Sequence, residues 1–367
     1  MECVLLFLLS ATLHSFPQSL EPAVRDQVQA GVAALKAGDL TAAQRHFEAV
    51  LKANPRLAEV RANLGLAYYA AHQYQLAIPQ FREALKQEPM LATARSFLPL
   101  SLAAVGRCQE AIPELNREFD GPSNAKLRRI TGLSLVKCYM QMDDNSAAAE
   151  AAAKLVSSYP DDPDVLYITG QLYGRLSNQL YMRLMKVAPH SARSYQVMAS
   201  VAAADGNWKI AIDAYRHALR IDPSLQDAHL QIAILLLTHS PDPNNWQQAL
   251  TELHEELKVN PMSSEAQYEM GEVYRKHDQP QAAVAAFRKS LELDPNAVPA
   301  RIGLAKALRQ IGQKQQALAV LQPAEQQAPN DAAVRFLLAQ LYRDLGQTVQ
   351  ASREEAVFQH LQRNANQ

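Results

Sequence analysis

The sequence predicts an all-α protein built from repeated antiparallel helix pairs. Prolines return at intervals of 34 residues, as in Pro261, Pro295 and Pro329. No stretch alternates apolar and polar residues as a half-buried strand does, and only 13 of the 367 residues are glycine. A fixed period of roughly 20 to 50 residues is typical of a solenoid, in which each unit buries its apolar face against its neighbours. We therefore expect a helical array with no sheet.

The unit at 58–91 shows why each period should form two helices. Small and apolar residues recur at i, i+3, i+4 and i+7 within two segments of the unit, which indicates two amphipathic helices. These residues are Leu64, Gly65 and Tyr68 in the first segment and Ala77, Phe81 and Ala84 in the second. The small residues allow close approach of the paired helices, the aromatic residues fill the space beside them, and Pro89 ends the second helix.

This pattern resembles the tetratricopeptide repeat, which has a small residue at position 8, Tyr at 11, Ala at 20, an aromatic residue at 24 and Pro at 32. Five residues of the unit at 58–91 match these positions, namely Gly65, Tyr68, Ala77, Phe81 and Pro89. The resemblance implies a right-handed α-solenoid of antiparallel helix pairs, and it extends over residues 20–367. About ten units follow in that register, at 24–57, 58–91, 92–125, 129–162, 163–191, 192–225, 226–263, 264–297, 298–331 and 332–367.

Three units depart from the regular pattern. Pro99 takes the small-residue position of the third unit, where a proline is expected to bend the first helix. The fifth unit runs from Tyr173 to Pro189 and is about five residues short. The seventh has four extra residues around 241–245, which suit a longer turn. The last helix, 349–363, carries many polar residues and is expected to form a polar cap.

Residues 1–19 form an apolar leader that suggests a signal peptide. The run from Cys3 to Leu13 is too short to span a bilayer but suits the core of a secretory signal. We expect no integral membrane span, and we expect an exported protein, periplasmic or secreted. The alternative is a cytoplasmic protein whose leader is a hydrophobic helix covering the first repeat. No basic residue precedes the run, and no small-x-small cleavage pair stands out before Phe16.

Cys108 and Cys138 are expected in neighbouring units. Cys108 should lie in the turn of the third unit, and Cys138 on the first helix of the fourth. A bridge between them is conceivable, but we favour two free, partly buried thiols, because free cysteine commonly packs as a small hydrophobic residue.

The sequence contains no constellation of residues that predicts catalysis, a cofactor or a metal. Its ten histidines are scattered, and it has neither a Cys-x-x-Cys pair nor a phosphate-binding glycine loop. His217, His229 and His239 are close in sequence but are expected on different helical faces. Acidic pairs such as Asp161-Asp162 and Glu354-Glu355 are expected to stabilise helix starts or to be solvated. We expect no enzymatic activity and no cofactor.

Charge argues against nucleic acid as a partner. The chain has 36 basic and 37 acidic residues and a net charge of −1, with no overall basic excess.

The resemblance implies a concave groove lined by the first helix of each unit, with residues at positions 2, 5, 9, 12 and 13 pointing into it. In the first three units these positions predict an apolar strip of Val28, Val32, Leu66, Tyr69 and Leu100. In the last three they predict a basic row with aromatic residues, made of Tyr268, Arg275, Lys306, Arg309, Phe336 and Arg343. Each set also has a structural alternative: the basic residues are then ordinary solvated groove residues, and Val32, Leu66 and Leu100 pack against the N-terminal apolar segment.

We expect a scaffold that binds protein or peptide partners in this groove, the apolar strip holding hydrophobic anchors and the basic row pairing with carboxylates. The alternative is a recruiting subunit of an enzyme complex, or of an envelope export or assembly machine, whose catalytic part is on another chain. Neither reading defines the partner or the oligomeric state.

Overall fold

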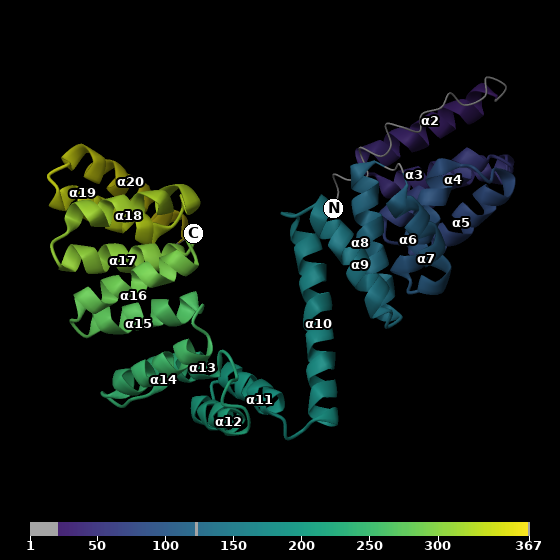
Figure 1. The fold of residues 1–367 in the computed structure, drawn as a ribbon. Helices are drawn as coiled ribbons and strands as arrows, with labels where there is room; N and C mark the ends of the chain where they lie inside the picture. Colours follow the sequence, from purple (N-terminus) through teal and green to yellow (C-terminus); the bar gives the residue numbers. More distant parts are fainter. Residues whose placement is uncertain (1–20, 122–123, 366–367) are drawn as a thin grey trace. The chain divides into compact units, whose positions relative to one another are not determined.

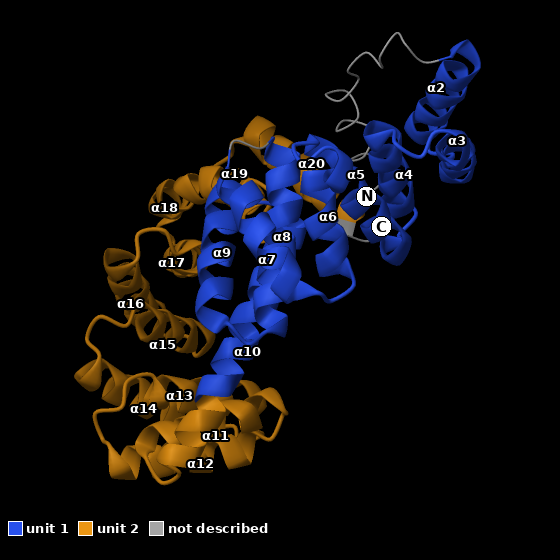
Figure 2. Cartoon of the chain, turned by 90° about the vertical axis from the view of Figure 1, so that its right-hand side faces the viewer, with its two compact units in different colours: residues 1–180 blue, residues 181–367 orange. Residues whose placement is uncertain are grey.

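The computed structural model describes residues 21–121 and 124–365, and over these ranges the protein consists of helices with no strand (Figure 1). The predicted leader at 1–19 lies outside the described residues. The chain divides into two compact units, at 1–180 and 181–367 (Figure 2). Among the described residues no helix is long and apolar enough to cross a membrane.

The first unit contains four consecutive helix pairs followed by most of one long helix. The pairs are α2 (Pro22–Ala37) with α3 (Leu40–Ala53), α4 (Ala58–Ala70) with α5 (Tyr74–Gln87), α6 (Ala92–Ala104) with α7 (Cys108–Asp120), and α8 (Ala125–Gln141) with α9 (Asn145–Ser158). The long helix is α10 (Pro163–Val187). One continuous apolar core runs through this unit and extends from Val28 to Leu172.

The second unit contains five further helix pairs after the last residues of α10. They are α11 (Ala192–Ala204) with α12 (Trp208–Ile221), α13 (Ala228–His239) with α14 (Asn245–Val259), α15 (Ser264–Lys276) with α16 (Pro280–Leu293), α17 (Val298–Gln310) with α18 (Lys314–Gln327), and α19 (Ala332–Asp344) with α20 (Thr348–Ala365). The predicted all-α solenoid of antiparallel pairs is confirmed.

The turn inside most pairs uses one residue in the left-handed backbone conformation. These residues recur at the same point of the repeat: Gly38, His72, Gly106, Asp143, Gly206, Asp278, Gly312 and Gly346. Such a residue ends a helix and reverses the chain within a few positions, which lets the second helix pack back on the first. In the pair α13–α14 the longer loop predicted around 241–245 replaces this turn.

The fifth unit differs from the prediction. Instead of two helices within 163–191, the structure has the single 25-residue helix α10. The corresponding turn position is Ser177, which lies inside α10, and no residue of this helix has a positive φ. Because the unit is about five residues short, it lacks the segment that makes the turn elsewhere, and its two helices are joined into one.

Cys108 and Cys138 form a disulfide, so the expectation of two free thiols is wrong. Cys108 is the first residue of α7, Cys138 lies on α8, and their Cα atoms are 5.2 Å apart. Both residues are buried, as expected, but burial brings them face to face between adjacent helix pairs. The bridge covalently joins the third and fourth repeats.

The acidic pairs take two different roles. Asp162 accepts hydrogen bonds from the backbone N–H groups of Asp164 and Val165, so it caps the start of α10 as predicted. Glu354, by contrast, is only 5% exposed and pairs with Arg335 at 2.8 Å. The prediction of a solvated polar cap at 349–363 is wrong for this residue, because the inner face of α20 packs on α19 and brings an Arg335 guanidinium to it.

Candidate functional site

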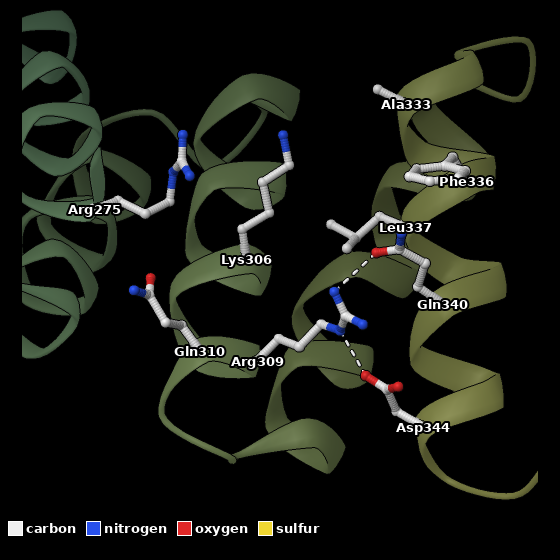
Figure 3. A pocket seen from close by; sticks show the side chains of 9 residues that line it. All are labelled: Arg275, Lys306, Arg309, Gln310, Ala333, Phe336, Leu337, Gln340 and Asp344. Atoms are coloured by element: carbon white, nitrogen blue, oxygen red, sulfur yellow. Dashed lines mark hydrogen bonds and ion pairs between the residues drawn. The ribbon is translucent and has the colours of Figure 1, made fainter. Parts of the chain in front are cut away.

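A pocket lies on the face formed by the first helices of the last three repeats. Its volume is about 540 Å³, and its lining comes from α15, α17 and α19. The lining residues are Arg275, Lys306, Arg309, Gln310, Ala333, Phe336, Leu337, Gln340 and Asp344 (Figure 3). The structure therefore brings together four of the six residues predicted for the basic row.

The repeat geometry explains this convergence. The first helices of successive repeats stand side by side, so residues at equivalent positions of each repeat gather on one surface. Arg275 and Arg309 occupy the same position, 34 residues apart, while Lys306 lies one turn before Arg309. In Figure 3 the ends of Arg275 and Lys306 point into the space that Phe336 faces from α19.

Two of the three lining cations are already paired within the protein. The Arg309 guanidinium donates from Nε to Asp344 Oδ2 at 2.5 Å and from Nη1 to Gln340 Oε1 at 2.9 Å. Arg275 donates to both carboxylate oxygens of Glu272, at 3.1 and 2.8 Å. These contacts fix the direction of both guanidinium groups.

The arginines lower the pKa values of the two carboxylates that hold them. The hydrogen bond from Arg309 lowers the pKa of Asp344 below its ordinary value. Burial alone would raise the pKa of Glu272, but the hydrogen bond from Arg275 and the charges of Arg275, Lys276 and Lys306 outweigh it, and the net pKa is lowered.

Lys306 and Phe336 are the lining groups left for a ligand. Lys306 is exposed, and no hydrogen bond or salt bridge joins it to any residue in the described ranges 21–121 and 124–365. The Phe336 ring is 43% exposed, and one of its neighbours is the ring of Phe358 at 5.2 Å. An ammonium group and an exposed aromatic ring thus share one concave surface.

The remaining residues of the predicted basic row lie outside the pocket lining. Arg343 is exposed but forms an ion pair with Glu355 at 2.6 Å. Tyr268 is half-buried, its ring centroid 6.0 Å from that of Phe287. Within the predicted basic row, the three arginines are neutralised by Glu272, Asp344 and Glu355.

The predicted apolar strip of the first three repeats is buried. Val28, Val32, Leu66 and Leu100 belong to the core of the first unit, where neighbouring helices cover them. Tyr69 is half-buried, with ring centroids 5.3 Å from Tyr74 and 5.0 Å from Phe97, and burial raises its pKa to about 12. The expectation of an exposed strip is wrong, because at these positions the side chains face the adjoining helices.

Several pocket residues were missed from the sequence. Ala333, Gln340 and Asp344 fall at positions 2, 9 and 13 of their unit, and Gln310 falls at position 13 of the preceding one. These positions belong to the groove set that the resemblance implies, so the register contained the signal. The repeat register does not predict that Arg309 pairs with Asp344 and Gln340, because these contacts join two different repeats.

No metal-binding cluster occurs among the described residues. His229 contacts Glu252 at 2.6 Å, whereas the His217 ring lies against Tyr195, with centroids 4.0 Å apart.

Comparisons with known proteins agree with the repeat architecture. Sequence models described as tetratricopeptide repeat match residues 28–89, 63–125, 133–162, 243–298 and 274–341. No curated protein matches the sequence.

Similar solved structures include YrrB, described as a TPR protein with an unusual peptide-binding site. The two are 19% identical, with a TM-score of 0.43, over 50% of this chain and 92% of YrrB. MamA from Desulfovibrio magneticus RS-1 is 19% identical, with a TM-score of 0.44, over 48% of this chain and 97% of that structure. Given the family matches and the nine helix pairs in the described ranges, the chain belongs to the tetratricopeptide repeat family.

Proposed function

We propose that this protein is a non-enzymatic scaffold that binds an acidic segment of a partner protein in the pocket of α15, α17 and α19. The observation that carries the proposal is the combination of Lys306, which has no ion-pair partner among the described residues, with the exposed ring of Phe336 in one cavity. Tetratricopeptide repeats are built for such contacts, since their stacked first helices form extended binding surfaces.

The chemistry of the lining defines the class of peptide. Lys306 is placed to pair with a side-chain carboxylate through a charge-assisted hydrogen bond. Phe336, Leu337 and Ala333 offer an apolar wall for a hydrophobic side chain close to that carboxylate. Arg275 and Arg309 are neutralised by Glu272 and Asp344, so Lys306 supplies the net positive charge of the lining.

Binding of paired synthetic peptides to the full chain tests this proposal. One pool places Asp or Glu within a few residues of Leu or Phe, and the matched pool carries Asn or Gln instead. We expect the acidic pool to bind and the Lys306→Glu variant to lose roughly tenfold or more in affinity, about 1.4 kcal/mol. Phe336→Ala should lower the affinity for the same peptides, because it removes the apolar contact.

A matched charge reversal provides the control. Lys289→Glu changes an exposed lysine on the second helix α16, outside the pocket lining, and should leave affinity unchanged. Equal binding of the acidic and amide pools, or equal losses in the two lysine variants, would contradict the proposal.

The second possibility is a recruiting subunit for an enzyme or export machine on another chain. It uses the same pocket, so peptide binding does not separate the two possibilities. Capture of partners from the native host does, if wild-type protein recovers a complex with measurable turnover that Lys306→Glu fails to recover.

We also propose that the protein is exported, and the Cys108–Cys138 disulfide supports this location. Structural disulfides persist in oxidising compartments and are rare where cellular thiols are kept reduced. Thiol labelling of protein taken directly from cells is the test: protection of both cysteines until a reductant is added is expected. Immediate labelling of both in fresh extracts would argue for the cytoplasm.

A further inference from the structure

The second half of α10 has the sequence of a second repeat helix. In four regular units an aromatic residue stands eight positions before the closing proline and an alanine stands twelve before it. Phe81 and Ala77 precede Pro89 in this way. The same spacing is filled in the fifth unit by Tyr181, eight positions before Pro189, and by the small residue Ser177, twelve before it. The helix α10 is therefore a first helix and a second helix fused end to end.

This fusion leaves the first half of α10 without the helix that normally packs on it. In three regular repeats, a Cβ atom at the small-residue position would lie 2.6–2.7 Å from a ring of the second helix. The pairs are Gly31 with Phe47, Gly65 with Phe81 and Gly271 with Phe287. At the equivalent Gly170, no atom lies within 4 Å of that point. At Gly170, therefore, the space that an aromatic ring fills in the three regular repeats is empty.

The open face is also apolar. Of the seventeen exposed large hydrophobic side chains in the described ranges, seven lie on α10. Four of these share the face of Gly170, namely Leu166, Tyr173, Leu180 and Val187, and Leu180 is 63% exposed. Leu166, Gly170, Tyr173, Ser177, Leu180, Leu184 and Val187 follow one another at alternating spacings of four and three. Such spacing produces one continuous stripe along a helix, as in helices that pair with a second helix.

We propose that α10 pairs antiparallel with α10 of a second copy of this chain, so that each copy supplies the missing second helix of the other's fifth repeat. In this arrangement the partner's Tyr181, which flanks the stripe one turn after Ser177 and one turn before Leu184, packs on Gly170. The pairing is two-fold symmetric, because the same contacts occur again with the copies exchanged. Two complete fifth repeats result.

Charge supports a second copy as the occupant. The amino end of α10 and the residues before it carry Asp161, Asp162 and Asp164, whereas its carboxyl end carries Arg183 and Lys186. Asp162 and Asp164 already pair with Arg129 of the same chain, so Asp161 is the one of these three carboxylates that faces the partner's basic end. An antiparallel pair brings the basic end of one helix against the acidic end of the other. Antiparallel helix dipoles favour the same arrangement.

Completion of the repeat within one chain is less favourable. The turns of the regular units contain a left-handed residue, and α10 has none. Folding back would unwind α10 near Ser177 and break its backbone hydrogen bonds, and would leave a second helix shorter than those of the other repeats. A partner's helix is already formed, and short connections between paired elements are known to favour such exchange.

The oligomeric state of the full chain tests this pairing, measured by sedimentation equilibrium. We expect wild-type protein to form a dimer and Gly170→Glu to be monomeric at the same concentration. The added side chain meets open space in the single chain, so the monomeric variant should keep the helix content of wild-type protein. The control Gln171→Glu adds the same charge at the next residue, which is exposed and points away from the stripe, and should remain dimeric.

Cross-linking separates the exchanged dimer from a fold-back within one chain. Along one helix, residues 170 and 181 are about 16 Å apart, too far for a disulfide. The double variant Gly170→Cys/Tyr181→Cys should therefore give a covalent dimer on oxidation. An oxidised monomer containing the bridge would show fold-back and overturn the proposal. A monomeric wild-type chain, or equal dissociation of Gly170→Glu and Gln171→Glu, would also overturn it.

Discussion

At the scale of single residues, the repeat depends on a glycine of the first helix that packs against an aromatic ring of the second. Gly65 and Gly271 face the rings of Phe81 and Phe287 so closely that even a methyl group has no room. This close approach is why the small residue at position 8 could be recognised from the sequence. It also distinguishes Gly170, where the sequence has the same residue type but the structure has no ring.

We predict opposite effects for the same substitution at two glycines. Gly271→Ala should lower stability by about 1–3 kcal/mol, because its Cβ would meet the buried ring of Phe287 at 2.6 Å. Gly170→Ala, measured at a protein concentration low enough to keep the chain monomeric, should be neutral or stabilising by up to about 1 kcal/mol, because alanine favours a helix and its methyl group meets open space in the single chain. Urea unfolding followed by circular dichroism measures both, and equal losses in the two variants would contradict the assignment of Gly170 as an unfilled position.

At the scale of helices, the sequence predicts the regular helix pairs. It does not predict features that depend on contacts between one repeat and the next. The 34-residue period predicts which segments are helical, because the spacing of small, aromatic and proline residues reflects packing within one unit. The two helices of the fifth unit are fused into α10 because about five residues of the turn are missing. The remaining sequence shows that the unit is short, but it does not show that the helices on either side of the gap become continuous. The burial of Val32 and Leu100 and the pairing of Arg309 with Asp344 depend on neighbouring repeats, which the pattern of one repeat does not describe.

The disulfide joins two helix pairs, and we predict that its removal weakens the first unit. It closes a loop between residues 30 positions apart, and a bridge of this kind contributes about 2–4 kcal/mol. A thiol reductant should lower the urea midpoint of wild-type protein by a corresponding amount. The Cys108→Ala/Cys138→Ala variant should be less stable than wild type and insensitive to reductant. A wild-type midpoint unchanged after verified reduction would contradict this prediction.

The amino end of α10 is tied to α8 by a charge pair that should make its stability depend on pH. Arg129 donates to both oxygens of Asp162, at 2.6 and 2.8 Å, and this hydrogen bonding lowers the pKa of Asp162. The stabilisation is therefore fully present above the ordinary pKa of aspartate and is lost as the pH falls toward the lower folded-state value.

We predict that wild-type protein is more stable than Asp162→Asn at pH 7 and that the difference shrinks below about pH 4. Urea midpoints of the two proteins between pH 7 and pH 3 provide the measurement. Comparison with the amide variant separates this carboxylate from the others that titrate in the same range. A difference that stays constant over the whole range would show that Asp162 acts through its shape and not its charge.

At the scale of the whole molecule, the chain consists of two compact units with separate cores. The core of the first unit ends at Leu172, and the buried clusters of the second begin at Ala192. Among the described residues, the side chains of α10 between these points are at most partly buried. In repeat proteins each repeat is stabilised mainly by contacts with its neighbours. A stretch with few buried side chains should therefore uncouple the unfolding of the repeats on its two sides.

We predict that the two units unfold independently. Gly271→Ala places its destabilising methyl group in the second unit, against Phe287. Hydrogen exchange followed by mass spectrometry should show faster exchange in α15, α16 and α17 and unchanged exchange in α4 to α9. Gly65→Ala, which makes the equivalent clash with Phe81 in the first unit, should show the reverse pattern. If either variant accelerates exchange throughout the chain, α10 transmits stability between the units, and the protein unfolds as one cooperative body in spite of its divided core.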